Sequence, residues 1–415
     1  MMDRKLDDKL ALRTAVGPDD VERVAAFNGH IHGAEVAEMT RALFLHHPHT
    51  QLENLIFVED VTSRQVVSSL CLIPWTWRYE GVDLPAGEMG IVGTLEGYRQ
   101  RGLIRAQVEL FQQQLSAGGF LLSHIQGIPH FYRQFGYEYA LPLEGGLRLE
   151  TRHIPDPSPT SFTFRLAAWK DLSVLMQQYD EAASELAIHA VRDRAVWEYL
   201  LRPFTGAETE HETWLIEDKA GQVAGYMRLP RYHFGEELVV DEVSRLSFDA
   251  ALAALHHFKG LVAQRQKPAV RLNLPGHCTL MRLARSLGAY DLGTYAWQVY
   301  FPDPMALLRV LAPVLERRVA ASPFAGMTRD VLLNLYRQAI RLCFANGQLI
   351  EVVGTDPTGD SAIRLPPLQL IPLLLGYRAA DELRTAHPDV AVAPLERMLV
   401  ETLFQKTTAF IHTPY

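Results

Sequence analysis

The chain has 415 residues, of which 48% are hydrophobic and 21% are charged, and this composition excludes a mainly disordered protein. At roughly 100–200 residues per domain, the length predicts two to four domains. The formal net charge is −8 and no Lys/Arg-rich block exists, so nucleic acids and anionic membranes are poor candidates as partners.

Three widely separated cysteines argue against a disulfide framework or a cysteine-rich zinc site and fit a reducing cytoplasm. The N-terminal segment carries charges where a signal peptide needs an apolar stretch. The longest apolar run, over residues 368–377, is shorter than the roughly 20 residues that span a bilayer. We therefore expect a cytoplasmic protein that has no membrane partner.

Two proline-rich joints divide the chain. Residues 154–161 contain three prolines, and residues 301–304 contain two. Proline can continue neither a helix nor a central strand. The joints predict three domains, over residues 1–153, 162–302 and 303–415.

In the first segment, the pattern of apolar residues predicts both strands and a helix. Apolar positions spaced four, three and four residues apart predict a helix over 103–117, which Gly118 and Gly119 end. The strands are expected over 54–59, 65–73, 89–94 and 120–124.

The second segment repeats this order in outline, and the third differs. A strand over 238–243 precedes a helix over 248–264, for which Ser247 is the expected N-cap. The later elements expected in the second segment are a strand over 269–274, a helix end over 283–288 and a strand over 295–300. In the third segment, Asn346-Gly347 predicts a hairpin over 341–352, followed by helices over 368–384 and 394–404. The fold class is therefore mixed α/β.

The most informative stretch is a basic, glycine-containing turn between a strand and the helix that starts near residue 103. Gly97 and Gly102 remove side chains where a ligand would approach closely. The amides of the turn and the positive end of the helix dipole form a site for anions, and Arg99, Arg101 and Arg105 add positive charge. The alternative interpretation is a solvated basic helix start.

This stretch resembles the acyl-CoA site of the GNAT N-acetyltransferases, whose motif is Arg/Gln-x-x-Gly-x-Gly/Ala. Ile104 departs from the last position of that motif. The sequences Arg-Gln-Arg-Gly-Leu-Ile-Arg at 99–105 and Phe-Tyr-Arg-Gln-Phe-Gly-Tyr at 131–137 are similar to one branch, the Eis-type (enhanced intracellular survival) enzymes. The resemblance implies a catalytic GNAT domain, a second GNAT-like domain without a CoA motif and a C-terminal α+β domain like sterol carrier proteins. It also implies that residues 391–415 form a final helix and a short closing strand.

The resemblance implies acetyl-CoA as co-substrate and assigns the residues that bind it. One strand edge would pair with the pantetheine amides, because it is left open where two strands diverge. Gly127 stands where the family usually has a serine, so one side-chain contact is missing there. The assigned positions are Val92, Gly93 and Thr94 on the strand, Gln100, Arg101, Gly102, Leu103, Ile104 and Arg105 at the pyrophosphate, and Gly127 and Ile128 near the acetyl group.

Two catalytic groups follow from the same resemblance. Tyr132 matches the tyrosine that donates a proton to the departing CoA sulfur, since a phenol with a pKa of about 10 is protonated at neutral pH. From the residues alone, Tyr132 is as easily explained as a core aromatic. The α-carboxylate of Tyr415 matches the general base, although an ordinary terminal carboxyl has a pKa of about 3.5 and needs desolvation or a relaying water. The alternative for Tyr415 is a frayed chain end.

The second segment lacks the Arg-x-x-Gly step, so we expect no CoA there. We expect a single-step transfer of acetyl to a primary amine of a polyamine, an aminoglycoside or a lysine, with acidic residues such as Glu35, Glu38 and Glu88 as candidates for the pocket. The resemblance also implies homo-oligomers, hexamers among them. The histidines at 30, 32, 46, 47 and 49 lack convincing ligand spacing, so no metal is expected. The alternative functions are a CoA-regulated binding protein for an apolar ligand and an acetyl-CoA binder without catalysis.

Overall fold

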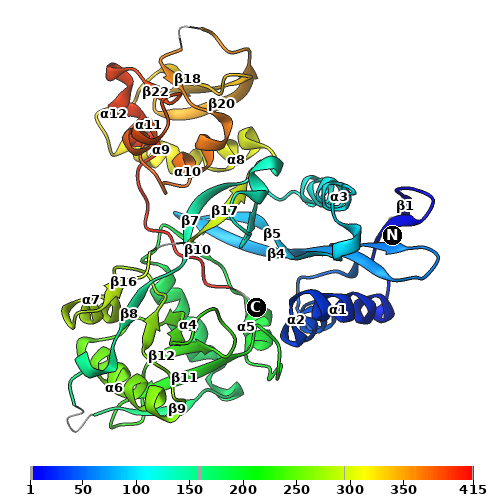
Figure 1. Ribbon diagram of the computed structural model, residues 1–415. Coiled ribbons are helices and arrows are strands. Elements are labelled where there is room, and N and C mark those ends of the chain that lie inside the picture. The colour runs from blue at the N-terminus through cyan, green and yellow to red at the C-terminus, as the bar shows by residue number, and fades with distance from the viewer. Residues whose placement is uncertain (1–2, 157–160, 294, 360, 414) are drawn as a thin grey trace.

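The computed structural model describes residues 3–156, 161–293, 295–359, 361–413 and 415. Its elements form three bodies, of which the first contacts both of the others (Figure 1). None of the helices in these ranges combines the length and the hydrophobicity needed to cross a membrane.

The first body is a twisted mixed sheet with helices on both faces. On β4, Leu70 and Leu72 face the core under α3, whereas Cys71 and Ile73 face the core under α1 and α2. This alternation is the strand period of two, and it explains why one apolar run supports helices on both faces. Its elements are β1 (Asp3–Lys5), β2 (Leu10–Thr14), α1 (Pro18–His32), α2 (Ala34–His46), β3 (Leu55–Asp60), β4 (Val66–Tyr79), β5 (Val82–Thr94), α3 (Leu103–Ala117), β6 (Leu122–Ile125) and β7 (Glu138–Glu144).

Strands β5 and β6 run parallel and then diverge. Their pairing covers Ala86 to Glu88 on β5 and ends where Glu88 faces His124. Beyond Glu88, β5 continues to Thr94 with β4 on one side and no strand on the other among the described residues. An open edge of this kind leaves backbone amides and carbonyls for a ligand.

The second body divides its sheet into two halves. Helices α6 and α7 pack on one core, and α4 and α5 pack on another. The helix α6 begins after Ser247, whose side chain accepts a hydrogen bond from the amide of Ala250, so the expected N-cap is confirmed. The elements of this part of the chain are β8 (Leu147–Leu149), β9 (Thr163–Leu166), α4 (Leu172–Ala183), β10 (Ile188–Ala190), α5 (Arg194–Leu200), β11 (His211–Glu217), β12 (Val223–Pro230), β13 (Leu238–Val240), β14 (Glu242–Val243), α6 (Phe248–Gln264), β15 (Val270–Leu272), α7 (Thr279–Ser286), β16 (Tyr290–Asp291) and β17 (Tyr295–Tyr300).

The first two bodies exchange strands. β17 lies between β6 and β7 in the sheet of the first body, and β10 pairs with β4. In return, β8 joins the order β13-β15-β8-β16 in the second body. Each of the two sheets therefore contains strands from both sides of the joint at residues 154–161.

The third body carries a sheet in the order β20-β19-β18-β21-β22. The predicted hairpin is confirmed, with Asn346 and Gly347 both at positive φ between β19 and β20. The helix expected over 368–384 is wrong: Gly376, at φ 64°, lies between α10 and α11. The elements are α8 (Pro304–Val310), α9 (Ala312–Ala320), β18 (Arg329–Asn334), β19 (Ala339–Ala345), β20 (Gln348–Thr355), β21 (Ile363–Arg364), α10 (Leu370–Leu374), α11 (Ala380–Ala386), β22 (Ala391–Val392) and α12 (Arg397–Leu403).

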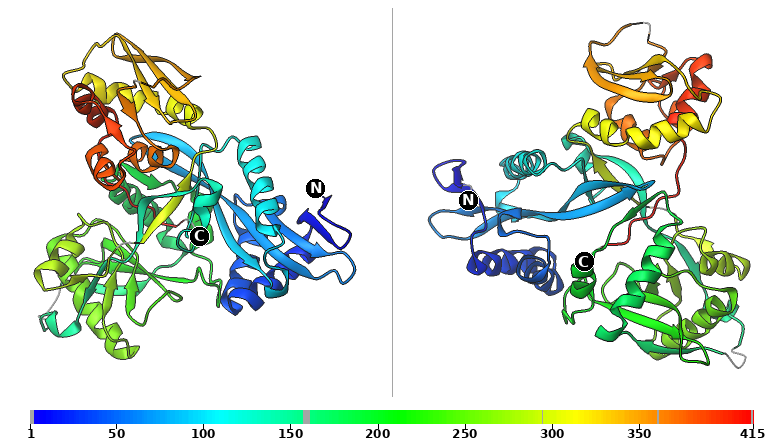
Figure 2. Two further views of the ribbon diagram at one scale, coloured as in Figure 1. Left: turned by 45° about the horizontal axis from the view of Figure 1, so that its top comes forward. Right: turned by 180° about the vertical axis from the view of Figure 1, so that it is seen from behind.

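The C-terminal tail leaves the third body after α12 and enters the junction of the other two (Figure 2). A closing strand was expected here, and the tail instead makes one isolated parallel bridge, between Ala409 and Ile188. The amide of Phe410 donates to the carbonyl of Ile188 at 3.1 Å. The tail thus follows β10, which itself lies on β4.

Candidate active site

The turn between β5 and α3 has the geometry of an anion site. Gln100 and Gly102 adopt positive φ values of 62° and 74°, and Gly102 is the N-cap of α3 with no side chain bonded to the helix end. The first amide of α3 that reaches a helical carbonyl is that of Ala106, which donates to Gly102. The amides of residues 103–105 therefore face the turn, where anions bind well.

The turn is also open and basic. A Cβ placed on Gly97 or on Gly102 would meet no atom within 4 Å. Arg101 lies over the ring of Tyr98, with its guanidinium carbon 5.0 Å from the ring centroid. Gln100, Arg101 and Arg105 are exposed, whereas Leu103 is buried and anchors the start of the helix. This arrangement holds charge at the surface of the turn and leaves space in front of its amides.

Hydrogen bonds from β4 and α3 hold the end of β5 in place. The hydroxyl of Ser68 donates to the carbonyl of Gly93 at 2.9 Å and lies 2.8 Å from the hydroxyl of Thr94. Gln107 of α3 donates to the same serine at 2.7 Å. Val92 packs against the hydrophobic cluster that contains Leu103, so the strand edge and the turn belong to one packed unit.

Tyr132 belongs to that same cluster. It lies in a short 3₁₀ turn, Phe131–Phe135, and only 5% of it is exposed. Its ring meets those of Phe131 and Tyr137 edge to face. Burial raises the pKa of the Tyr132 phenol, so the phenol keeps its proton at neutral pH. Tyr132 is thus a core aromatic that also meets the requirement of a proton donor.

The ring of Tyr132 packs directly against the backbone of Gly127. A Cβ on Gly127 would lie 2.3 Å from two ring carbons of Tyr132, which is closer than any side chain tolerates. The carbonyl of Gly127 accepts hydrogen bonds from Tyr295 and from Gln298, the latter at 2.9 Å, so β17 holds this backbone. Ile128 is 65% exposed. The absence of a side chain at position 127 therefore makes room for the ring of Tyr132.

Replacing Gly127 with serine should reduce turnover without unfolding the protein. The new side chain must push the ring of Tyr132 aside, and a misplacement of about 1 Å in a catalytic group costs on the order of 10²-fold in rate. Thermal unfolding and steady-state kinetics would separate a loss of kcat from a loss of folded protein. Gly260→Ala is the matched control, because nothing lies within 4 Å of its Cβ position. Unchanged kcat in Gly127→Ser would show that the ring position is not needed.

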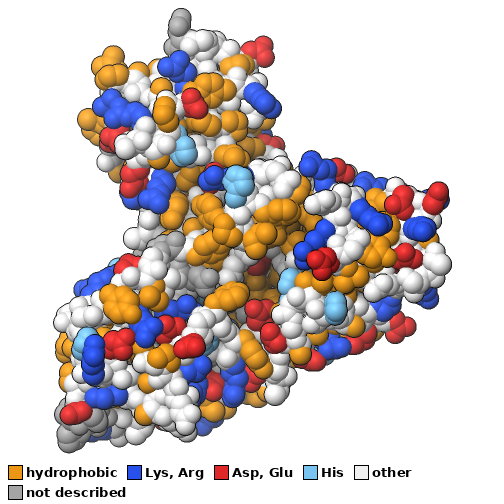
Figure 3. All heavy atoms as spheres, viewed as in Figure 1, with side chains coloured by type: hydrophobic (Ala, Val, Ile, Leu, Met, Phe, Trp, Pro, Cys, Tyr) orange, Lys and Arg blue, Asp and Glu red, His pale blue; other side chains and the backbone are white. Residues whose placement is uncertain are grey.

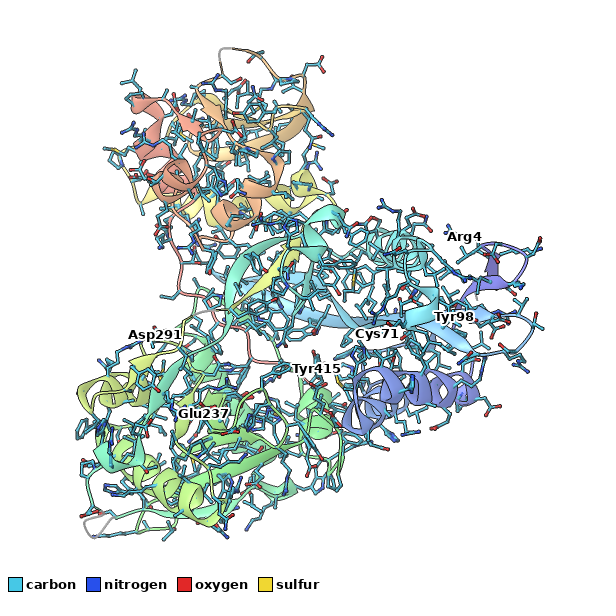
Figure 4. All side chains as sticks on the ribbon, viewed as in Figure 1. Arg4, Cys71, Tyr98, Glu237, Asp291 and Tyr415 are labelled. Atoms are coloured by element: carbon cyan, nitrogen blue, oxygen red, sulfur yellow. The ribbon has the colours of Figure 1, made fainter. Side chains whose placement is uncertain are left out.

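The chain end is held, not frayed. The phenol of Tyr415 donates to the carboxylate of Glu88, with 2.8 Å to each oxygen, and its ring meets Trp75 at a centroid distance of 5.7 Å. Figure 4 places Tyr415 at the tip of the tail, between the second body and the sheet of the first. The terminus therefore reaches the point where β5 and β6 diverge.

A buried ion pair in the second body holds the tail. Arg192 donates to the carbonyl of Thr413 at 2.6 Å and to both oxygens of Glu242, at 2.9 and 2.7 Å. The side chain of Arg192 has no exposed surface, and its guanidinium lies 4.4 Å from the ring centroid of Tyr179. Burial alone would raise the pKa of Glu242, but the charges of Arg192 and Arg228 hold it well below its usual range.

Glu88 is a buried carboxyl with an unusual environment. Burial raises its pKa to about 8, and the hydrogen bond from Tyr415 opposes this shift. The ring of His124 lies 3.7 Å from one of its oxygens and packs among Trp75, Trp77 and Trp297. Burial also lowers the pKa of His124 well below its usual value, so this ring is neutral. A carboxyl with a pKa near neutrality can exchange protons at physiological pH.

The raised pKa predicts how stability depends on pH. The folded state favours the protonated form of Glu88. The stability that this form contributes is therefore fully present below the unfolded pKa of 4.5 and is lost as pH rises through the folded pKa of about 8. Glu88→Gln removes this dependence. The Tm of the variant minus that of the wild type should therefore increase by a few degrees from about pH 5 to pH 8. A constant difference between the two Tm values across this pH range would contradict the assignment.

Glu208, which follows α5, acts on this site, and Glu35 of α2 lies beside it. The amide of Glu208 donates to the carbonyl of Glu35 at 3.0 Å. Burial and the charge of Glu35 raise the pKa of Glu208, and the charge of Glu208 in turn acts on Tyr415. Glu38 instead pairs with Arg41. Figure 3 shows a hollow at the centre of this face, with hydrophobic side chains gathered around it and acidic side chains beside it.

Sequence reasoning identified Glu88 and Glu35 as candidates and missed His124 and Glu208. The histidine is invisible as a site residue because only the parallel pairing of β5 with β6 places it opposite Glu88. The clustered histidines make ordinary contacts: His49 pairs with Asp193, and His46 stacks on Phe204. Within the described ranges, no group of three or more His, Cys, Asp or Glu side chains could hold a metal.

Comparison with known proteins agrees with this geometry. Residues 15–140 match the family model of the acetyltransferase (GNAT) domain. No curated protein matches the chain by sequence. The structure of a GCN5-related N-acetyltransferase from Anabaena variabilis is similar, with a TM-score of 0.70, 17% identity and coverage of 97% of this chain and 99% of that one.

Two other solved structures are similar over nearly their whole length. A probable N-acyltransferase from Enterococcus faecalis has a TM-score of 0.69 and 16% identity, covering 97% of this chain and all of the other. Eis1 from Mycobacterium abscessus has a TM-score of 0.64 and 16% identity, covering 98% and 100%. These likenesses confirm the mixed α/β fold. Residues 15–140 of the chain form a GNAT acetyltransferase domain.

Proposed function

We propose that the protein transfers acetyl from acetyl-CoA to a primary amine by direct attack, without an acyl-enzyme intermediate. GNAT domains generally use acyl-CoA, which supplies the reactive thioester. The turn of residues 100–105 fits the pyrophosphate through its free amides and Arg101. The open edge of β5 at residues 92–94 fits the pantetheine amides.

Tyr132 is the proposed general acid. Its pKa is raised by burial, so it is protonated when a departing thiolate needs a proton. Cys71 is fully buried on β4, and burial also raises its pKa, so it is a poor nucleophile. These features favour direct attack over a covalent acyl-cysteine.

The contact between Tyr415 and Glu88 carries the proposal for the base. It brings the terminal residue to a carboxyl whose pKa is about 8, at the divergence of β5 and β6. We assign the α-carboxylate of Tyr415 as the group that takes the proton of the amine, and Glu88 as the residue that positions the terminus. Glu208 and Glu35 supply negative charge that attracts a cationic substrate.

Other features belong to this proposal. The tandem architecture and the likeness to Eis1 support an Eis-type enzyme, with a catalytic domain over 1–153, a second GNAT-like domain over 162–302 and a carrier-like domain over 303–415. A cytoplasmic, homo-oligomeric protein is expected. The alternative of a CoA-regulated binding protein is not favoured, because the first domain matches an acetyltransferase model.

Release of free thiol from acetyl-CoA tests the function. The protein should release CoA faster with amines that carry two or more positive charges than with a monoamine of similar size that has no other charged group. The reason is that the carboxylates of Glu208 and Glu35 attract positive charge. Polyamines, an aminoglycoside and a lysine peptide form the panel. An absence of thiol release with every amine, despite acetyl-CoA binding, would leave the protein as a binder.

A further inference from the structure

The C-terminal tail is held by the second body in two different ways. The amide of Phe410 donates to the carbonyl of Ile188 at 3.1 Å, and this bond uses backbone groups only, so it depends on no particular side chain. Beyond Phe410, the described residues of the second body give the tail one further hydrogen bond, from Arg192 to the carbonyl of Thr413 at 2.6 Å. The position of the last residues therefore depends on the Arg192 side chain.

The length of chain beyond each contact shows how much this side chain matters. An extended chain spans at most about 3.5 Å per residue, so the end of the chain could range over about 17 Å from Phe410 but over only about 7 Å from Thr413. The other contact that holds the end is in the first body, where the phenol of Tyr415 donates to Glu88 at 2.8 Å. With Arg192 in place, the terminal carboxylate thus lies between two nearby points of attachment.

The guanidinium of Arg192 is itself held in one orientation. Its two terminal nitrogens donate to both oxygens of Glu242, at 2.9 and 2.7 Å, and it lies 4.4 Å from the ring centroid of Tyr179 and 5.1 Å from that of Trp197. A guanidinium is planar, so pairing with a carboxylate fixes the direction of its remaining N–H groups. One of these, on Nη2, donates to Thr413. The tail therefore meets a donor whose position is set in advance.

We propose that Arg192 is a positioning residue for acyl transfer, which places the carboxylate of Tyr415 through the hydrogen bond to Thr413. This inference rests on the function proposed above, in which that carboxylate accepts the proton of the amine. The second body lacks the Arg-x-x-Gly step of the first, and its contribution to the reaction is to fix the base against the sheet of the first body. A displacement of about 1 Å in such a group costs on the order of 10²-fold in rate.

Arg228 provides the matched control, because it is buried beside the same carboxylate. It is 1% exposed and lies 3.4 Å from Glu242, and among the described residues it donates no hydrogen bond to the tail. Loss of either arginine leaves Glu242 with one cation fewer, so Arg192→Met and Arg228→Met should both lower the Tm. Only Arg192→Met should lower kcat, by about 10–100-fold with the KM for acetyl-CoA unchanged, while Arg228→Met keeps kcat within about twofold.

A shortened chain separates positioning from general damage to the fold. In a protein that lacks Tyr415, Arg192→Met should lower kcat by no more than about a further twofold, because the carboxylate that Arg192 positions is gone. Arg192→Lys is the second variant, in case Arg192→Met does not fold. Lysine keeps the charge beside Glu242 but lacks the planar fork, so kcat should fall about tenfold with a smaller loss of Tm.

Kinetics of thiol release and thermal unfolding of these variants decide the inference. Equal losses of kcat in Arg192→Met and Arg228→Met, or the same loss from Arg192→Met in the full and the shortened chain, would indicate a purely structural role and overturn it. A loss of kcat on deletion of Tyr415 but none in the folded Arg192 variants would overturn this inference alone. Deletion of Tyr415 without any loss of kcat would overturn the proposed base, and this inference with it.

Discussion

Tyr132→Phe should lower kcat for acetyl transfer by about 10²–10⁴-fold, the usual contribution of a general acid. The ring and its packing remain, so the protein should fold normally and bind acetyl-CoA as before. The substitution removes the hydroxyl, and with it the proton that the buried phenol keeps available for the sulfur. Thiol release at saturating acetyl-CoA and amine measures the effect, and calorimetric titration with CoA checks binding.

Tyr300→Phe is the matched control for this experiment. Its phenol ring is half-buried beside Tyr137, with centroids 5.4 Å apart, in the same aromatic group as Tyr132. Removing that hydroxyl should leave kcat within a factor of about two, as expected for a group outside the reaction. If Tyr132→Phe behaves like the control, the proton for the sulfur comes from elsewhere, and the core interpretation of Tyr132 suffices.

Helix α3 and strand β17 could be read directly from the sequence, because local patterns decide them. The apolar spacing over residues 103–117 and its flanking glycines gave the bounds of α3 as the structure has them. The strand over 295–300 also matches β17. Which sheet a strand joins is a long-range property, so the sequence did not reveal that β17 completes the first body.

Strand β4 was predicted too short for a specific reason. Pro74 follows Ile73, and proline normally ends a central strand. In the structure, β4 continues to Tyr79. On the side of β4 away from β5, β3 pairs with it only up to Cys71, and β10 pairs with it from Trp77 onward. The missing amide of Pro74 thus faces a gap in the sheet. Such a gap exists only after β10 has arrived from the second body.

The part of the site that lies in one continuous motif could be predicted from the sequence. The part that forms through contacts between distant residues could not. The turn at residues 100–105 is local, so its glycine and arginines could be identified. The pairing of Tyr415 with Glu88 joins residues 327 positions apart, and Arg192 fixes the tail through Thr413. The buried charge of Arg192 is understandable only once Glu242 lies beside it.

The largest expected effect at the other end of the chain comes from removing Tyr415. Deletion of this residue, or extension by a few residues, should lower kcat by about 10²–10⁴-fold, because the terminal carboxylate no longer reaches the amine. Binding of acetyl-CoA should be retained, since the tail is not among the residues proposed to hold the pyrophosphate and the pantetheine. Kinetics of thiol release with a fixed polyamine would measure the loss.

Tyr415→Phe separates the carboxylate from the phenol. This variant keeps the terminal carboxylate and the contact with Trp75 but loses the hydrogen bond to Glu88, which is worth about 0.5–1.5 kcal/mol when Glu88 is protonated, below its pKa of about 8. We expect a modest fall in kcat. A fall as large as that of the deletion would show that the contact with Glu88, and not the carboxylate, governs the reaction.

Addition of a small carboxylate gives the decisive comparison. Formate or acetate can enter the space left by deletion of Tyr415 and accept the proton of the amine, so turnover should recover in proportion to its concentration. The extended chain still fills that space, so it should not be rescued. If the extended chain is active without rescue, Glu88 itself is the better candidate for the base, because its pKa of about 8 already lies in the working range.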